Sequence, residues 1–119
     1  MALGEDVPET TGALANIGNK LNFPLGKATG SQDNINRSIA MARQLARIGL
    51  PDSQSTREYL TEHLNQVVLD GNNITRIQEN GRIVRESLLM GPEGGVKLQT
   101  IWEGNKLITI KIFGAKPIN

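Results

Sequence analysis

The spacing of apolar positions changes once along the chain, at Gly71. Before this glycine, apolar side chains recur every three or four residues in two stretches, which is typical of helices with one buried face. After it, apolar and polar residues alternate, as they do in strands that bury one face. Helices followed by strands predict an α+β domain.

Two helices are predicted in the first part of the chain. The first covers about 33–48, with Ser31 or Asp33 as its N-cap. The second begins after Asp52 or Ser53 and ends at the change of spacing. Both carry an apolar stripe that can cover one face of a sheet.

Four strands in two hairpins are predicted after the helices. Asn80-Gly81 favours a two-residue turn in the first hairpin, and Glu103-Gly104-Asn105 is interpreted as a three-residue turn in the second. The predicted strands are Ile74–Glu79, Arg82–Met90, Val96–Trp102 and Lys106–Phe113. The predicted architecture is therefore two N-terminal helices packed on one face of a four-stranded antiparallel meander, with the other face partly open.

Residues 1–22 are predicted to be a flexible linker and lead-in, in which 16–20 can form one short turn. The first part of this segment combines acidic residues, proline and glycine and has no apolar period. The folded domain is then expected to comprise residues 23–119, with Phe23 and Leu25 available to anchor its start on the core.

The alternation in the strands assigns side chains to two faces. In the first hairpin the more apolar face is predicted to meet the helices, and it holds Thr75, Ile77, Val84, Glu86, Leu88 and Met90. In the second hairpin that face holds Val96, Leu98, Trp102, Ile108, Ile110 and Ile112. The opposite face is predicted to lie open, and its polar residues are Arg76, Arg85, Ser87, Lys97, Gln99, Thr109 and Lys111.

The composition excludes several kinds of chemistry. With 119 residues the chain is long enough for one domain that buries a core. It has no cysteine and one histidine, so disulfides, zinc–thiolate sites, iron–sulfur clusters and sites with several histidines are excluded. The sequence has no acidic cluster of the calcium-loop kind, and we expect neither a metal nor a cofactor.

Charge is distributed unevenly along the chain. The formal net charge is +1, but residues 71–119 carry seven basic and four acidic side chains, a net charge of +3. A mildly basic second half is compatible with a polyanionic ligand. No apolar run approaches the roughly 18 residues of a membrane span, and the N-terminus has no signal-peptide pattern, so we expect no membrane span.

The predicted open face is the main candidate for chemistry. Arginine, lysine and hydroxyl side chains can hold a phosphodiester and stabilise the charge that develops during attack, although they are also ordinary on a solvated strand. His63 is suited to proton transfer near neutral pH, and its place beside the apolar stripe equally fits a packing histidine. Glu86 is either a carboxylate paired with Arg82 or a helix arginine, or a general base if the faces alternate the other way.

Several stretches of the sequence resemble a known family. They are Phe23–Ser31, Asn36-Arg37-Ser38, Asn80–Pro92 and Trp102–Thr109, and the likeness extends over about residues 23–114. These stretches resemble the variable C-terminal toxin domains of contact-dependent growth inhibition proteins, the large filamentous-haemagglutinin-like exoproteins of Gram-negative bacteria.

The resemblance implies a toxin that is secreted to the cell surface as the C-terminus of a large exoprotein, acts in the cytoplasm of a neighbouring bacterium and is neutralised by a cognate immunity protein. Many such domains are nucleases, and several that cleave RNA resemble the barnase, EndoU, colicin and RelE group. That group packs N-terminal helices against a four-stranded antiparallel sheet whose open face holds the active site. Its members need no metal: a base deprotonates the ribose 2′-hydroxyl, an acid protonates the leaving oxygen, and cations stabilise the phosphorane.

Residues and resemblance together lead to the hypothesis of a metal-independent ribonuclease toxin that cleaves tRNA. We expect a monomeric toxin that forms a heterodimer with an immunity protein, and the basic face predicts that this inhibitor is acidic. A metal-dependent DNase toxin and a non-catalytic module that binds protein through the basic face are the alternatives.

The hypothesis assigns roles to particular side chains. The expected catalytic residues are His63, Arg85, Ser87, Lys97 and Thr109. The histidine would act as acid or base, the two cations would stabilise the phosphorane, and the two hydroxyls would orient the phosphate or the 2′-hydroxyl. The residues expected to bind the RNA backbone are Lys27, Arg76 and Lys111.

Overall fold

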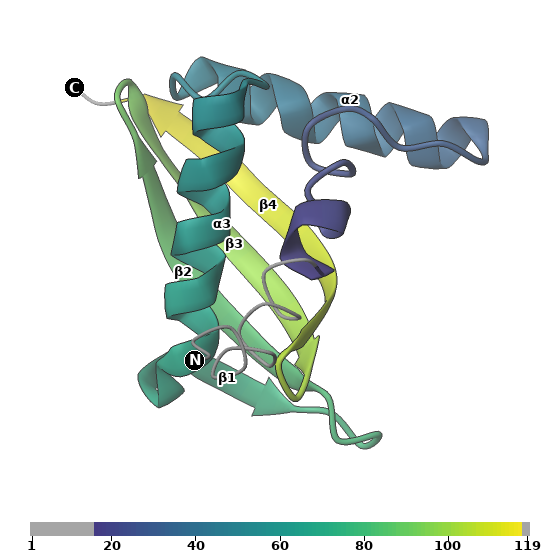
Figure 1. The fold of residues 1–119 in the computed structure, drawn as a ribbon, viewed down its shortest axis with the longest axis vertical. Helices are drawn as coiled ribbons and strands as arrows, with labels where there is room; N and C mark the ends of the chain where they lie inside the picture. Colours follow the sequence, from purple (N-terminus) through teal and green to yellow (C-terminus); the bar gives the residue numbers. More distant parts are fainter. Residues whose placement is uncertain (1–15, 118–119) are drawn as a thin grey trace, which may run out of the picture.

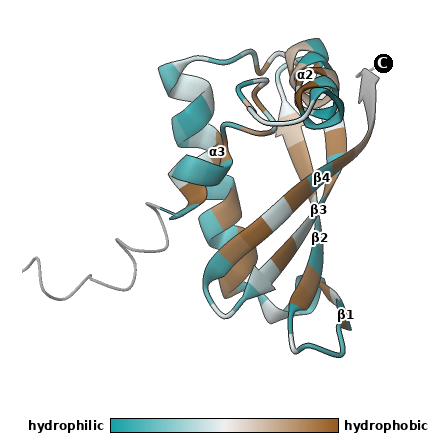
Figure 2. Ribbon diagram, turned by 90° about the vertical axis from the view of Figure 1, so that its right-hand side faces the viewer, coloured by the Kyte–Doolittle hydropathy of each residue, from teal (hydrophilic) through white to brown (hydrophobic). Residues whose placement is uncertain are grey.

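The structure is a computed structural model that describes residues 16–117, with side chains as far as 113. After a helical turn at 16–20, its elements are α2 (Gln32–Arg47), α3 (Gln54–Leu69), the 3₁₀ turn η2 (Gly71–Asn73), β1 (Ile74–Ile77), β2 (Ile83–Gly91), β3 (Gly94–Glu103) and β4 (Lys106–Pro117). The strands form one antiparallel sheet in the order β1-β2-β3-β4 (Figure 1). The helices lie on one face of the sheet (Figure 2). On the other face Leu88, Met90 and Lys111 are exposed, whereas Val84 is buried. The predicted α+β architecture is confirmed.

Both helices begin at a serine. The Oγ of Ser31 and the Oγ of Ser53 each accept a hydrogen bond from the backbone N–H three residues on, at 3.2 and 3.1 Å. Of the predicted N-cap candidates, Ser31 and not Asp33 caps α2, and Ser53 and not Asp52 caps α3. The first helix ends where Gly49 adopts a φ of 88°, a left-handed conformation that brings the Leu50 N–H within 2.9 Å of the Leu45 carbonyl.

The core lies between the helices and the covered face of the sheet. Trp102 is fully buried there, and its indole N–H donates to Thr100 Oγ1 at 2.8 Å, so its one polar atom is satisfied. The helices contribute Leu45, Leu60, Leu64 and Val67, and the sheet contributes Leu89, Val96, Leu98, Leu107 and Ile110.

The end of the predicted lead-in is packed on this core. Ile17 and Leu21 have exposures of 0% and 1%, and the Asn16 side chain accepts a hydrogen bond from the Leu107 N–H at 2.6 Å. These residues belong to the segment that the sequence assigned to a flexible lead-in. Residues 1–15 of that segment lie outside the described residues.

The first hairpin differs from its prediction. Ile77 pairs with Ile83, so residues 78–82 form a longer loop in place of the expected two-residue turn. The loop is closed by backbone bonds, from the Gln78 N–H to the Arg82 carbonyl and from the Gly81 N–H to the Gln78 carbonyl, both 2.8 Å long. The two strands are correspondingly shorter at this end than the sequence indicated.

The faces of β2 are also opposite to the prediction. Leu89, with 0% exposure, lies against Val96 on the covered face, so Glu86 and Leu88 lie on the open face. The prediction was wrong because β2 carries apolar residues on both faces and has more of them on the open one. The faces are decided by pairing with β3, whose buried residues alternate regularly.

In the second hairpin most side chains lie on the predicted faces, although the turn and the pairing differ from the prediction. Glu103 pairs with Lys106, so the turn has two residues instead of three. A bulge then adds one residue to β4 and restores the expected alternation from Thr109 onward. Leu107 is the exception: the sequence placed it on the open face, but it is buried with 0% exposure.

Candidate functional site

The sheet separates residues that were predicted to form one site. Ser87 pairs with Leu98, whereas Lys97 pairs with the neighbouring residue Leu88, so the serine and the lysine point to opposite faces. The covered face of the sheet holds Arg85 and Ser87, and His63 lies against it from α3. The open face holds Arg76, Lys97, Thr109 and Lys111. The prediction that Arg85 and Ser87 lie on the open face is therefore wrong. One phosphate cannot contact these two residues and Lys97 together.

Arg85 stabilises the end of a helix. Its Nη1 donates to the Val67 carbonyl at 3.2 Å, to the Asp70 carbonyl at 2.6 Å and to Oδ1 of Asn73 at 2.9 Å. The last carbonyls of a helix lack intrahelical donors, and the helix dipole favours a cation at this end. Burial lowers the pKa of the guanidinium, and the nearby Asp70 carboxylate opposes the change. Arg85 thus ties β2 to the C-terminus of α3.

His63 and Ser87 form a pair between α3 and β2. The His63 Nε2 lies 3.0 Å from the Ser87 Oγ, within hydrogen-bond distance. Burial lowers the pKa of the half-buried imidazole below its ordinary value of 6.5, so the ring is neutral at neutral pH. A neutral imidazole beside a hydroxyl can accept a proton, and the same contact also fits a packing role.

The open face carries an ion pair near its centre. The Lys97 Nζ lies 3.4 Å from the Glu86 Oε1, and the two side chains are 60% and 33% exposed. Gln99 lies between Glu86 on β2 and Lys111 on β4. Together with Thr109 these residues place a carboxylate, an amide, a hydroxyl and two ammonium groups on one accessible surface, called here the open-face cluster (Glu86, Lys97, Gln99, Thr109 and Lys111).

Glu86 lies on the open face, so the faces of β2 alternate opposite to the prediction. Its ion-pair partner is Lys97, and not Arg82 or a helix arginine. The signal that could have predicted its face is in β3. Val96, Leu98 and Trp102 alternate regularly, and the two-residue turn Pro92-Glu93 carries their register into β2.

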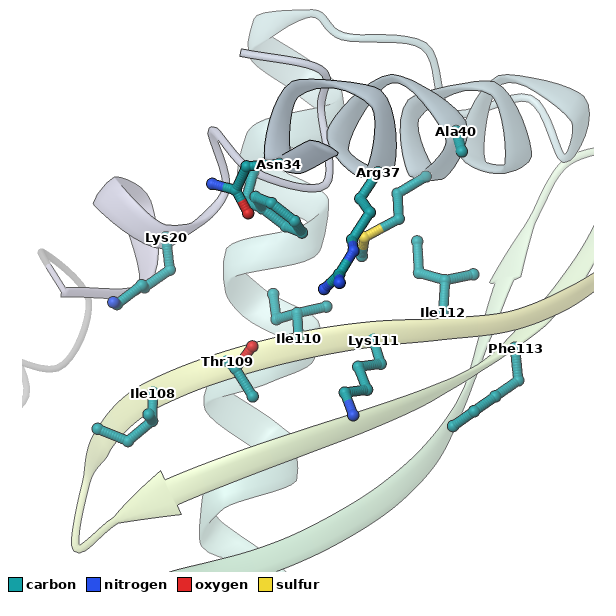
Figure 3. A pocket seen from close by; sticks show the side chains of 12 residues that line it. Lys20, Asn34, Arg37, Ala40, Ile108, Thr109, Ile110, Lys111, Ile112 and Phe113 are labelled. Atoms are coloured by element: carbon teal, nitrogen blue, oxygen red, sulfur yellow. The ribbon is translucent and has the colours of Figure 1, made fainter. Parts of the chain in front are cut away.

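A groove runs between α2 and β4 along the outer edge of the sheet (Figure 3). Its cavity volume is about 590 Å³, and three cations from three segments line it: Lys20 from the lead-in, Arg37 from α2 and Lys111 from β4. Lys111 and Thr109 belong both to this groove and to the open-face cluster. Lys20 and Arg37 were not predicted as site residues, because no local pattern in the sequence shows that they approach β4.

The two remaining predicted RNA contacts lie in different places. Lys27 is exposed in the loop before α2, where it adds to the larger effect of Arg57 in lowering the pKa of Asp52. It is therefore close to the start of α3. Arg76 is exposed on β1 opposite Val84, on the same face as the open-face cluster.

Among residues 16–117, no group of three or more histidine, cysteine, aspartate or glutamate side chains is placed to hold a metal ion. None of the helices in this range has the length and apolar character needed to cross a membrane.

Comparison with known proteins adds a structural neighbour. No family model and no curated protein matches the sequence. The structure is similar to a chain of the contact-dependent growth inhibition toxin–immunity protein complex from Klebsiella pneumoniae 342, with a TM-score of 0.68 and 25% identity. The match covers 87% of this chain and 98% of that chain, so it concerns the whole fold. It supports the resemblance to contact-dependent growth inhibition toxins at the level of the fold.

Proposed function

We propose that this protein is a contact-dependent growth inhibition toxin and that it acts as a metal-independent ribonuclease on tRNA. The toxin assignment is supported by the neighbour in a toxin–immunity complex and by helices packed on one face of a four-stranded sheet. The enzymatic assignment rests on one observation, the Glu86–Lys97 ion pair on an accessible basic sheet face.

The open-face cluster supplies a base, two cations and a hydroxyl for RNA cleavage without a metal. The Glu86 carboxylate takes the proton of a ribose 2′-hydroxyl, and the 2′ oxygen then attacks the adjacent phosphorus. The bond from phosphorus to the 5′ oxygen breaks, and that oxygen takes a proton from water. Lys97 and Lys111 balance the negative charge on the phosphorane, while Thr109 donates a hydrogen bond that orients the phosphate.

The His63–Ser87 pair is the second candidate for proton transfer. Its support is the 3.0 Å contact and the lowered pKa of the imidazole, which leaves the ring free to accept a proton. Because the pair lies on the covered face, it would act on a phosphate that does not touch Lys97. Arg85 and Ser87 would then belong to that site and not to the open face.

The proposed partner is a cognate acidic immunity protein that forms a heterodimer with the monomeric toxin and covers the open-face cluster. Aspartate and glutamate side chains placed against Arg76, Lys97 and Lys111 would both block RNA and speed association. In this proposal the domain is exported at the C-terminus of a large exoprotein and acts in the cytoplasm of the target cell.

Incubation of the purified protein with tRNA, total RNA and double-stranded DNA, each in EDTA and in magnesium, tests the proposal. We expect tRNA cleavage that is the same in EDTA and magnesium. Loss of DNA only in magnesium would instead support the DNase alternative. Absence of hydrolysis of every substrate, with tight binding of an acidic inhibitor, would support the binding module.

A further inference from the structure

We infer that the groove between α2 and β4 binds one unpaired nucleotide of the RNA, next to the bond that is cleaved. This inference rests on the proposed function and adds a requirement to it: the substrate must have a single-stranded nucleotide beside the cleavage site. Four features of the groove support it, namely its cations, its apolar lining, its exposed aromatic ring and its continuity with the open-face cluster.

The cations of the groove favour an anionic ligand. Figure 3 shows Arg37 reaching from α2 toward β4, with Lys111 on the other side of that strand and Lys20 at one end. None of the described residues that line the groove is acidic. Arg37 pairs with Asp33 at 3.1 Å, but their side chains are 69% and 75% exposed, and such a pair is easily exchanged for a phosphate.

The rest of the lining distinguishes a nucleotide from a simple phosphate. Most of it is apolar, and Figure 3 shows Ile110 and Ile112 pointing from β4 toward α2. Phe113 is 45% exposed and lies opposite Lys97 in the sheet, so its ring offers a stacking surface beside the open-face cluster. A nucleotide matches this lining, because its anionic phosphate suits the cations and its flat base suits the apolar side chains and the ring. Only an unpaired base presents its face to a protein, because a duplex covers base faces by stacking.

The groove is continuous with the open-face cluster. Thr109 and Lys111 line the groove and also belong to the cluster. Glu86 lies two strands away from β4, about 10 Å at the usual strand spacing. A single RNA strand spans that distance within a few nucleotides, so one substrate can occupy both places. An acidic protein segment without apolar side chains would satisfy the cations but would leave the apolar lining and the exposed ring without a matching group.

Binding of an RNA oligonucleotide that cannot be cleaved tests the inference separately from catalysis. Fluorescence anisotropy compares a single-stranded 2′-O-methyl oligonucleotide with its duplex, and we expect wild type to bind the single strand more tightly. Arg37→Gln and Lys20→Gln should each weaken single-strand binding about tenfold and reduce the dependence of log Kd on log salt by about one. Phe113→Leu should reduce the preference for the single strand over the duplex.

Arg43→Gln is the matched control, because Arg43 is exposed on the same helix and does not line the groove. It should leave single-strand affinity unchanged, and thermal melting should show that every variant is folded. Equal effects of Arg37→Gln and Arg43→Gln, or equal affinity of wild type for single strand and duplex, would overturn the inference.

Two outcomes separate this inference from the proposed function. In the first, wild type cleaves tRNA in EDTA, while Arg37→Gln retains full RNA affinity and loses affinity only for the immunity protein. The groove is then a protein-docking site, and this inference fails while the proposed function stands. If wild type cleaves no RNA while Arg37→Gln still loses single-strand binding, the proposed ribonuclease activity fails and the groove remains a nucleotide site.

Discussion

The two faces of the same sheet use their charged residues in different ways. On the covered face, Arg85 is 7% exposed and its guanidinium is bound to acceptors at the end of α3. On the open face, Lys97 and Glu86 pair with each other and remain accessible. A buried charge must find partners inside the protein, whereas an exposed pair loses little when it exchanges a partner for a ligand. A basic residue on a strand therefore indicates a binding site only once its face is known.

The largest expected effect is on the rate of tRNA cleavage, and it distinguishes the proton-transfer candidates on the two faces. Glu86→Gln should lower tRNA cleavage by about 10²–10⁴-fold, because it removes the proposed base, while the melting temperature stays unchanged. Glu103→Gln is the control, since Glu103 is an exposed glutamate at the end of β3. His63→Ala should retain cleavage. The opposite result, with inactive folded His63→Ala and active Glu86→Gln, would move the active site to the covered face.

The second prediction concerns stability on the covered face. Arg85→Ala should lower the free energy of unfolding by about 2–3 kcal/mol, because carbonyls at the end of α3 lose a charged donor. Urea denaturation measures the change. Lys97→Ala should change the same free energy by less than about 0.5 kcal/mol, as expected for an exposed residue. A stable but inactive Arg85→Ala variant would show that Arg85 acts on the substrate instead.

The third prediction uses the lowered pKa of His63. The unfolded chain takes up a proton at this ring near its ordinary pKa of 6.5, whereas the folded protein does so only at lower pH. The contribution of His63 to the free energy of unfolding is therefore complete above pH 6.5 and falls as the pH is lowered toward the folded pKa. The loss is at most about 1.4 kcal/mol for each pH unit in this range. Urea denaturation at several pH values should show a smaller loss for His63→Gln. The same profile for both proteins would contradict a buried neutral ring.

The smallest expected effect tests the proposed inhibitor on the open face. Lys97→Ala and Lys111→Ala should each slow association with the immunity protein severalfold, and association of wild type should slow steeply as salt is raised. Lys106→Ala is the control, because Lys106 is exposed at the start of β4 and outside the open-face cluster. A flat salt profile with unchanged association of both variants would place the inhibitor elsewhere on the toxin.

The order of elements was predictable because its signals are local. Ser31, Ser53 and Gly49 act within a single helical turn, and a change of apolar spacing marks where helices give way to strands. The same applies to the buried alternation of β3, which is visible in a few consecutive residues. Such features depend on neighbours along the chain, so the sequence by itself was enough to determine the α+β architecture and the two-helix, four-strand order.

The faces of β2 and the groove were decided only by the tertiary structure. Both faces of β2 carry apolar residues, so the pattern alone does not say which one meets the helices; Leu89 settles it by packing against Val96. Arg85 shares the covered face with Leu89 because strand residues alternate, and the carbonyls that accept its hydrogen bonds there belong to α3, a separate element. Lys20, Arg37 and Lys111 likewise line one groove only because three separate segments converge at β4. The periodicity of the sequence does not record such an arrangement of distant segments.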